Sequence, residues 1–468
     1  MTLQKLFSAK DMTIGTPWKR IMEFSVPMLL GNLAQQLYNT ADSIVVGRYV
    51  GDNALAAVGS ALPILNLLLA LFVGVSAGAG IVVSQSFGAR DRDGLTRAIG
   101  NCLALSAVAS VVIMIIGPLL TMPLLKLLGT PISIIDWCAD YLNIYFLGIV
   151  GFFFYNMLSG ILRGLGDSVS ALGFLIVAAA LNVVLDIWFV AGLDLGVAGV
   201  AWATIIAQAI SAVLCYLKLI RMRDLFDLNL KTVKLERAMS GHILRIGIPS
   251  GVTQAIMATA GMVMLNLTNA MGETVIACNV VVMRVDGFAM LPNMTFGQAM
   301  SVYTGQNVGA RKFDRVHAGV KQGGILAALF STVITAVLLF CGKFLFNLFT
   351  DTPELIDLAN RMIRVMAVGY ICISVTQVLG GVMRGAGDTV TPMWISLIST
   401  IAIRIPVGYV LAYFTRTEEF PHGQPIALFL SLMISWAMGM VISAIVFKIG
   451  RWKKKMYGAQ VPAGPKLD

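Results

Sequence analysis

Charged side chains are scarce in this chain of 468 residues: Lys, Arg, Asp and Glu make up only 12% of it, whereas 57% is hydrophobic. A soluble domain carries about 25% charged residues. The mean hydropathy is correspondingly high, at +0.83. This shortage of charge excludes a soluble globular protein and predicts a polytopic membrane protein, with loops too short for a separate soluble domain.

The residue types that most often carry enzymatic or metal chemistry are also scarce. The three histidines, His242, His317 and His422, are scattered, and neither a DDxxD nor an HExxH motif occurs. The six cysteines fall in apolar stretches without a CxxC pair, so we interpret them as helix-packing residues rather than disulfides or metal ligands. No GxxxxGK[ST] motif is present, so ATP is not the direct energy source. These absences argue against a membrane-embedded enzyme and predict no bound cofactor.

Long apolar runs, by contrast, are abundant. A helix needs about 20 apolar residues to cross the hydrocarbon core of a bilayer. Twelve segments are predicted to do so: 21–46, 54–82, 97–120, 137–160, 169–190, 196–219, 243–269, 276–303, 316–342, 359–383, 391–413 and 425–448. The first of them is too long for a signal peptide and lacks a small-residue cleavage site, so no signal peptide is expected.

The net charge of +10 is distributed unevenly along the chain. With the N-terminus inside, the loops predicted on the cytoplasmic side hold most of the Lys and Arg, which is the positive-inside bias. The densest basic stretches are the loop between the sixth and seventh helices and the tail (Lys218, Arg221, Arg223, Lys231, Lys234, Arg237, Arg245; Lys448, Arg451, Lys453, Lys454, Lys455). This bias predicts two cytoplasmic termini in a bacterial-type inner membrane, and it argues against a nucleic-acid partner.

The chain contains an internal duplication. Residues 85–90 (QSFGAR) recur as 306–311 (QNVGAR), and residues 158–168 (LSGILRGLGDS) recur as 379–389 (LGGVMRGAGDT). Both pairs are offset by 221 positions, and Pro27 and Pro249 are offset by 222. A shared offset in separate motifs predicts two halves of six helices each.

We therefore predict an all-α protein with twelve transmembrane helices in two pseudo-symmetric six-helix bundles: an N-lobe at 1–220, a cytoplasmic linker at 221–242, a C-lobe at 243–450 and a basic tail at 451–468. Because six is even, the repeat is parallel, with a pseudo-twofold axis along the membrane normal. Two such lobes would enclose a central cleft that opens to either side in turn. The repeated RGxGD loops are interpreted as turns, in which Gly permits a tight backbone and Asp caps the next helix; a substrate contact is the alternative.

Four polar residues are predicted to converge in the outer half of the N-lobe. Asp42 lies near the outer end of the first helix, and Asn182 and Asp186 share one face of the fifth. Thr204 lies at a matching depth in the sixth helix. Two acids brought close cannot both stay ionised at low cost, and acids in hydrocarbon usually have a function. The set is therefore a candidate site for a shuttled proton or for Na⁺; the alternative, that each acid pairs with a cation or caps a backbone break, is weakened because no Lys or Arg lies at that depth.

The C-lobe lacks this set. At the same offsets it carries Met264 (approximately), Ile403, Val407 and Pro425, so any ion site is one-sided. Arg284 and Asp286 on the eighth helix and Arg404 on the eleventh are its own intramembrane charges. We expect Asp286 and Arg404 to form a buried neutralising pair, with a substrate or coupling role as the alternative.

Further residues are predicted to line the cleft. A proline inside the first helix weakens its hydrogen bonding and permits a bend, and methionines give adaptable apolar walls suited to varied ligands. The candidates are Pro27, Gln35, Tyr38, Asn39, Asn156, Gln254, Met257, Met264 and Met283. For each of these singly, ordinary packing is the alternative.

Together these features resemble a multidrug and toxic compound extrusion (MATE) transporter of the DinF-like branch, over residues 17–450. The resemblance rests on residues 38–42 (YNTAD), 181–186 (LNVVLD) and 196–204 (GVAGVAWAT), and on the repeated QxxGAR and RGxGD motifs. It implies that acids on the first and fifth helices, with a nearby Asn and Thr, form a cation site, and the matching positions are Asp42, Asp186, Asn182 and Thr204. It also links the helix-1 proline, here Pro27, to bending upon protonation. The sodium-coupled NorM-like branch uses acids on the seventh and tenth helices, which are absent here.

The resemblance thus implies secondary active antiport by alternating access. The exported compounds would be organic cations or other amphipathic molecules, exchanged for H⁺ or Na⁺, and a monomer in contact with membrane lipid would suffice. The alternative is a lipid or lipid-linked sugar flippase of the related superfamily. Such a protein would be expected to show more basic residues along the cleft and often additional helices.

Overall fold

Apolar helices make up nearly all of the computed structural model, which describes residues 9–229, 231–418 and 420–458. The helices are α2 (Pro17–Tyr49), α3 (Asp52–Gly88), α4 (Arg92–Leu127), α5 (Ile132–Leu147), α6 (Ile149–Gly164), α7 (Ser168–Ile187), α8 (Gly196–Ile220), α9 (Arg237–Ala270), α10 (Glu273–Gly309), α11 (Phe313–Asn347), α12 (Pro353–Gly385), α13 (Val390–Ser396), α14 (Ile405–Phe414), α15 (Ile426–Ile449) and α16 (Arg451–Gly458), with the π-helical segments η1 (Trp188–Gly192) and η2 (Leu397–Arg404). Each of the twelve predicted spans coincides with one helix or with consecutive helical segments.

Ten of the described spans are long and apolar enough to cross a membrane, and α5 with α6 forms an eleventh that is bent by 55°. The bend lies at Gly148, between the two helices. α2 has 33 residues and carries Gln35 and Gln36 in its middle. The prediction of an all-α membrane protein is confirmed.

The internal duplication is visible in the backbone. α3 and α10 both contain 37 residues and begin 221 positions apart. Gly51 and Gly272 precede them with φ values of 105° and 100°, and Arg90 and Arg311 follow them, both with φ 55°. A left-handed backbone is costly for a residue with a side chain, so its recurrence at one offset shows that the two halves share a fold.

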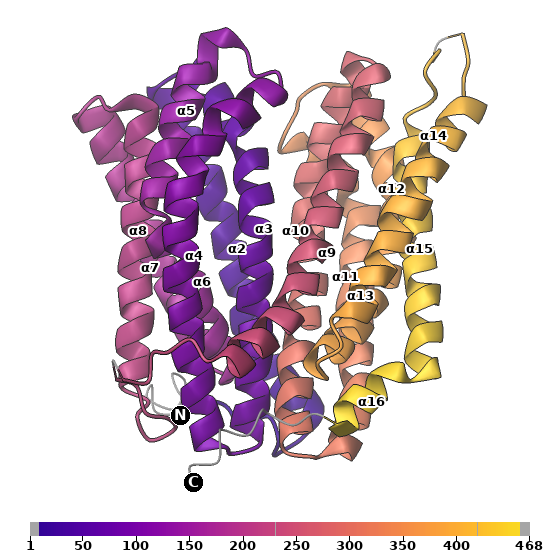
Figure 1. The fold of residues 1–468 in the computed structure, drawn as a ribbon. Coiled ribbons are helices and arrows are strands. Elements are labelled where there is room, and N and C mark those ends of the chain that lie inside the picture. Colours follow the sequence, from indigo (N-terminus) through magenta and orange to yellow (C-terminus); the bar gives the residue numbers. More distant parts are fainter. Residues whose placement is uncertain (1–8, 230, 419, 459–468) are drawn as a thin grey trace. The chain divides into compact units, whose positions relative to one another are not determined.

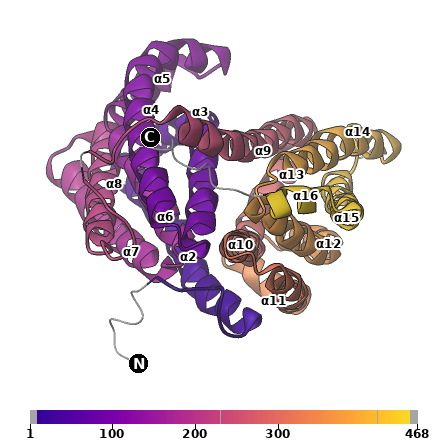
Figure 2. The ribbon, with the colours of Figure 1, turned by 60° about the horizontal axis from the view of Figure 1, so that its bottom comes forward.

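The chain forms two compact units. Unit 1 comprises residues 9–11 and 26–251 of the described chain. In it α6 packs against α3, α4 and α8, and α7 lies beside α8 (Figures 1 and 2). The apolar core at these contacts includes the rings of Phe72 and Phe153, stacked with centroids 3.6 Å apart. The direct contact between α7 and α8 makes these two helices neighbours within this unit.

Unit 2 comprises residues 12–25 and 252–458 of the described chain. Its central helix is α12, which packs against α10, α11 and α15 (Figure 1). Tyr370 of α12 and Trp436 of α15 are both buried in its apolar core, with ring centroids 5.4 Å apart. This unit has its own core, as expected for one half of a duplicated fold.

The two compact units differ from the two sequence repeats in where the first residues of each repeat belong. Residues 12–25 pack within unit 2, where the Met12 amide donates to Gln306 Oε1 at 2.8 Å. The start of α9 packs within unit 1, where Gly251 lies so close to Gly74 of α3 that neither has room for a Cβ. The predicted boundaries at 220 and 243 therefore describe the repeat in the sequence, whereas the packing units exchange these leading segments.

The RGxGD loops are turns with capped helices, as predicted. Gly166 and Gly387 have φ values of 83° and 86°. Asp167 accepts hydrogen bonds from the backbone and the hydroxyl of the residue three positions later, at 2.9 Å and 2.7 Å. Asp388 makes the equivalent contacts at 3.4 Å and 2.6 Å. Each loop thus joins two helices through a glycine turn and an aspartate that accepts hydrogen bonds from the start of the next helix.

Candidate functional site

A buried polar cluster lies between α7 and α8 of unit 1. Asn182, Asp186 and Thr204 are 0%, 0% and 7% exposed. With the Asn182 amide turned so that its nitrogen faces Asp186, Nδ2 donates to Asp186 Oδ2 at 2.8 Å, and the amide oxygen accepts from the Thr204 backbone N–H at 3.2 Å. This orientation satisfies both ends of the amide, so three of the four predicted residues of the cation site are brought together.

The local sequence explains this arrangement. Residues four apart on a helix share one face, which places Asn182 above Asp186 on the side of α7 that meets α8. Thr204 points into the same contact, and its hydroxyl donates to the Val200 carbonyl at 3.0 Å within α8. A carboxylate in an apolar core needs compensation by hydrogen bonds, a proton or a cation. The cluster therefore has the chemistry of a site that takes up a proton or a hard cation.

Asp42, the fourth predicted member, lies in α2. Its side chain is outside the described part of the structure, as are those of Tyr38 and Asn39, although the helix backbone is described there. That Asp42 completes the cluster stays a prediction.

A π-helical segment follows the cluster directly. η1 begins at Trp188, two residues after Asp186. The equivalent helix of unit 2 also contains a π-helical segment, η2, which ends at Arg404. π-helical segments are rare and occur frequently at functional sites. Neither was foreseen, because the apolar periodicity of the sequence does not distinguish a π turn from an α turn.

The remaining predicted cleft residues of unit 1 are in ordinary helical surroundings. Pro27 lies inside α2, next to the point at which this helix passes from unit 2 into unit 1. Gln35 is half-buried on the same helix. Asn156 of α6 donates from Nδ2 to the Phe152 carbonyl at 2.9 Å, so its amide is bonded within its own helix.

The predicted cleft residues of unit 2 differ in burial. Gln254 and Met283 are exposed, whereas Met264 is only 4% exposed and packs in the apolar core. Met257 is partly buried on the wall of a small cavity. A common cleft formed by the residues of both units stays a prediction.

The intramembrane charges of unit 2 include a partner that the sequence did not indicate. The Tyr370 hydroxyl donates to Asp286 Oδ1 at 2.7 Å. Arg404 interacts favourably with Asp286 through its charge, yet its buried Nε has no hydrogen-bond partner among the described residues. Arg284, two residues before Asp286 on α10, is exposed. A tyrosine within an apolar helix usually indicates packing, so no sequence signal marked Tyr370.

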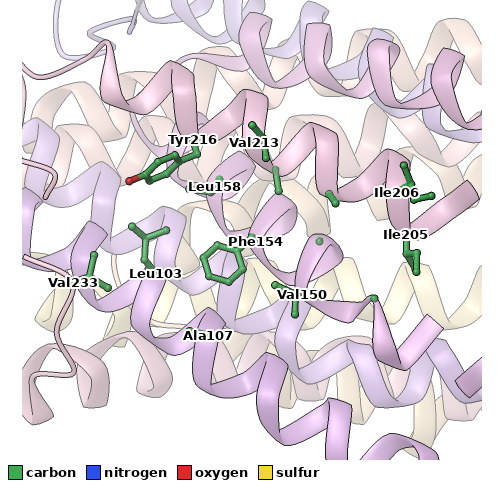
Figure 3. A pocket seen from close by; sticks show the side chains of 14 residues that line it. Leu103, Ala107, Val150, Phe154, Leu158, Ile205, Ile206, Val213, Tyr216 and Val233 are labelled. Carbon is green, nitrogen blue, oxygen red and sulfur yellow. The ribbon is translucent and has the colours of Figure 1, made fainter. Parts of the chain in front are cut away.

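A cavity of about 670 Å³ opens in unit 1 between α4, α6 and α8 (Figure 3). The lining side chains labelled in Figure 3 are apolar apart from the hydroxyl of Tyr216; Leu103, Phe154 and Ile205 are among them. None of the predicted cation-site residues lines it. An apolar wall offers no ligands to an ion, so this cavity is distinct from the candidate cation site.

Comparison with known proteins identifies the class. The profile of the MatE family matches the chain twice, at residues 27–188 and 249–410. The chain therefore belongs to the MATE family of multidrug efflux transporters, and the resemblance noted from the motifs is confirmed. The two matched segments coincide with the two halves of the duplication.

The similar proteins are transporters and not enzymes. The probable multidrug resistance protein YpnP of Bacillus subtilis is 30% identical over 445 residues, which cover 95% of this chain and 98% of YpnP. The probable multidrug resistance protein YoeA of the same organism is 28% identical, with coverages of 94% and 95%. A solved structure, an outward-facing conformation of a multidrug resistance MATE family transporter, superposes with a TM-score of 0.88 at 24% identity, with coverages of 96% and 99%.

Proposed function

We propose that this chain is a secondary active antiporter that exports organic cations or other amphipathic compounds in exchange for H⁺ or Na⁺ by alternating access. The observation that carries the proposal is the buried cluster of Asp186, Asn182 and Thr204 in unit 1. The equivalent positions of unit 2 carry Ile403, Val407 and Pro425, which offer no side-chain ligand. A buried acid with an amide and a hydroxyl beside it, present in one repeat and absent from the equivalent positions of the other, is suited to a coupling ion.

The coupling follows from differential binding. Uptake of a proton or cation neutralises Asp186. This changes the relative free energies of the conformations between which the transporter alternates. The ion and the cargo would prefer different conformations of the transporter. Binding of the ion shifts the protein away from the conformation that binds the cargo, and the cargo is released. A coupling free energy of about 1–3 kcal/mol, or 5- to 150-fold in affinity, is sufficient for such exchange.

Of the two candidate ions, H⁺ is compatible with the orientation of the Asn182 amide that satisfies both of its ends. The Asn182 amide presents its nitrogen, a donor, to the Asp186 carboxylate at 2.8 Å. Sodium requires oxygen ligands, so its binding between these two side chains would require the amide to turn. A proton requires no such rearrangement.

The test is dye export by the purified protein in vesicles under an imposed proton or sodium gradient, applied separately. Asp186→Asn and Asp42→Asn should each abolish gradient-driven export, because a neutral amide cannot exchange a proton. Asp136→Asn, at an exposed acid of α5, is the control and should export normally. Full activity of Asp186→Asn under both gradients would falsify the assignment. A wild-type protein that moves no dye under either gradient would favour a lipid or lipid-linked sugar flippase.

The orientation is proposed from the basic segments. The linker and tail carry most of the densest Lys and Arg clusters, which favours a cytoplasmic position of both termini in a bacterial inner membrane. A monomer suffices, because both units belong to one chain. Protease digestion of tags fused to each end, in intact cells and in inverted vesicles, tests the topology: cleavage in intact cells would contradict it.

A further inference from the structure

We propose that unit 2 contains a binding site for a small anion, chloride or a carboxylate group, centred on Arg384. A cavity of about 70 Å³ lies among α9, α12, α13, η2 and α15, all within this unit. Of the described residues on its wall, Arg384 is the one that carries a charge, and most of the polar remainder are hydroxyl side chains. A positive charge among hydroxyl groups is the composition of an anion site.

The duplication shows that the environment of this arginine is unusual. Its counterpart in unit 1, Arg163, donates from Nη1 to Ser159 Oγ at 2.7 Å. The residue equivalent to Ser159 is Gly380, and a Cβ on that glycine would lie 3.2 Å from Arg384 Nη1. Unit 2 thus lacks the hydroxyl that binds the guanidinium in unit 1, and the guanidinium itself lies against the bare glycine.

Arg384 has no alternative partner in the described part of the chain. None of the ion pairs there includes it, and its side chain is partly buried in the last turn of α12. An uncompensated charge inside a membrane protein is costly and usually marks a binding pathway or a missing counter-charge. An anion in the adjacent cavity would supply that counter-charge.

A second polar group on the same wall also lacks a partner. Ser443 of α15 is 1% exposed, and its hydroxyl has no hydrogen-bond partner among the described residues. Helical serines usually donate to the carbonyl four residues earlier, as Ser399 does to Ile395 at 2.8 Å on this wall. Leaving a buried hydroxyl without a hydrogen bond is unfavourable. An anion in the cavity would accept from Ser443 as well as from Arg384.

The size and chemistry of the cavity define the ligand. A volume of about 70 Å³ holds a few water molecules, because one water needs roughly 10–15 Å³ by this measure. Chloride fits such a space, as does the carboxylate end of a larger molecule. The guanidinium fork binds planar carboxylates through two parallel hydrogen bonds. Both ligands share one chemistry, a compact anion that accepts from Arg384 and from hydroxyl groups.

This inference is independent of the proposed cation exchange. The cation cluster lies in unit 1, whereas the anion cavity lies wholly in unit 2. A binding measurement on the full-length protein in detergent tests the anion site without any transport. If the protein proved not to be an antiporter, the proposal of an anion site would still stand. If no anion bound, the proposal of cation exchange would still stand.

Trp436 provides the readout, because it lies on the cavity wall and is only 8% exposed. Bromide quenches tryptophan fluorescence, and a bound bromide gives a saturable component above the linear collisional quenching. The ionic strength is kept constant with a bulky sulfonate buffer. We expect the saturable component in the wild-type protein and its loss in Trp436→Phe. Competition by sodium chloride alone identifies an inorganic anion site, and competition by sodium acetate identifies a carboxylate site.

Matched variants decide whether Arg384 is responsible. Arg384→Gln should weaken the saturable component at least tenfold, whereas Arg163→Gln, at the paired counterpart, should leave it unchanged. Gly380→Ser keeps the charge but adds a hydroxyl beside the guanidinium, and it should weaken bromide binding at least fivefold. If Arg384→Gln does not fold, Gly380→Ser decides alone. Wild-type quenching in every variant that folds, or the absence of any saturable component in the wild-type protein, overturns the proposal.

Discussion

With the Asn182 amide in the orientation that satisfies both of its ends, its Nδ2 lies 2.8 Å from Asp186 Oδ2, within one turn of α7. The carboxylate at the centre of the candidate cation site is thus held by an amide from its own helix. The amide is held in turn by the backbone N–H of Thr204 on α8, at 3.2 Å. The protonation state of Asp186 is therefore linked to the contact between α7 and α8.

Replacing Asn182 by Ala should change the ion dependence of transport. A hydrogen bond to a charged group contributes about 1.5–3 kcal/mol, and its loss disfavours the ionised carboxylate. We therefore expect half-maximal proton-driven export at a proton concentration about tenfold lower than in the wild-type protein. Thr204→Val should have a smaller effect, because the Thr204 hydroxyl donates to Val200 and not to the carboxylate. An unchanged proton dependence of Asn182→Ala would show that the amide does not act on Asp186.

Replacing Tyr370 by Phe should destabilise unit 2. The change removes the 2.7 Å hydrogen bond to Asp286 and leaves a partly buried carboxylate without that donor, at a cost of about 1–3 kcal/mol. Thermal unfolding of the purified protein in detergent should show a melting temperature lowered by several degrees. Tyr413→Phe, at a tyrosine that is 62% exposed, is the control and should melt with the wild-type protein. Equal melting temperatures for both variants would contradict the role of the hydrogen bond.

Replacing Gly251 by Ala should disrupt the packing of α9 on α3. A Cβ at this position would lie 2.7 Å from the Leu71 Cα, a contact that requires the backbone to move. Overpacking of this kind costs about 1–3 kcal/mol or more. Gly261→Ala is a control on the same helix, because nothing lies within 4 Å of a Cβ there; it should be neutral or stabilise by up to about 1 kcal/mol. The measurement is the yield of folded protein together with its melting temperature, and equal values for the two variants would refute the close approach.

Replacing Asp167 or Asp388 by Ala should weaken the two RGxGD turns to similar degrees. Each change removes an N-cap, at a cost of about 0.5–2 kcal/mol, and a lysine contact, Lys218 at 3.5 Å or Lys455 at 2.9 Å. Thermal unfolding should show both losses, and the wild-type melting temperature is expected for Asp136→Ala, at an exposed position. A loss at only one of the two aspartates would show that the repeated loops are not equivalent in energy.

Local sequence was sufficient for the elements and for part of the site. Runs of apolar residues predicted every span, because a helix in a membrane must satisfy its own backbone. The spacing of Asn182 and Asp186 predicted their shared face, because helical neighbours recur every three or four residues. The RGxGD turns followed from the conformational freedom of glycine and the capping ability of aspartate.

Contacts between distant segments were not accessible in this way. Asp286 and Tyr370 are 84 positions apart, and the helical period of α12 does not reveal which of its residues faces α10. The packing of Gly251 against Gly74 likewise depends on how closely two helices approach. Even the RGxGD repeat concealed a difference, because the serine that binds Arg163 and the glycine beside Arg384 differ by a single hydroxymethyl group.

The sequence by itself determined the apolar helical spans, the duplication and the presence of the Asn182–Asp186 pair in only one of the two repeats, since these depend on residue type and spacing along the chain. Only the tertiary structure decided which polar groups meet, which leading segments the two units exchange, and that Arg384 has no ion-pair partner among the described residues. The physical reason is that a helix forms from its own hydrogen bonds, whereas the neighbours of each side chain are chosen by the packing of the whole unit.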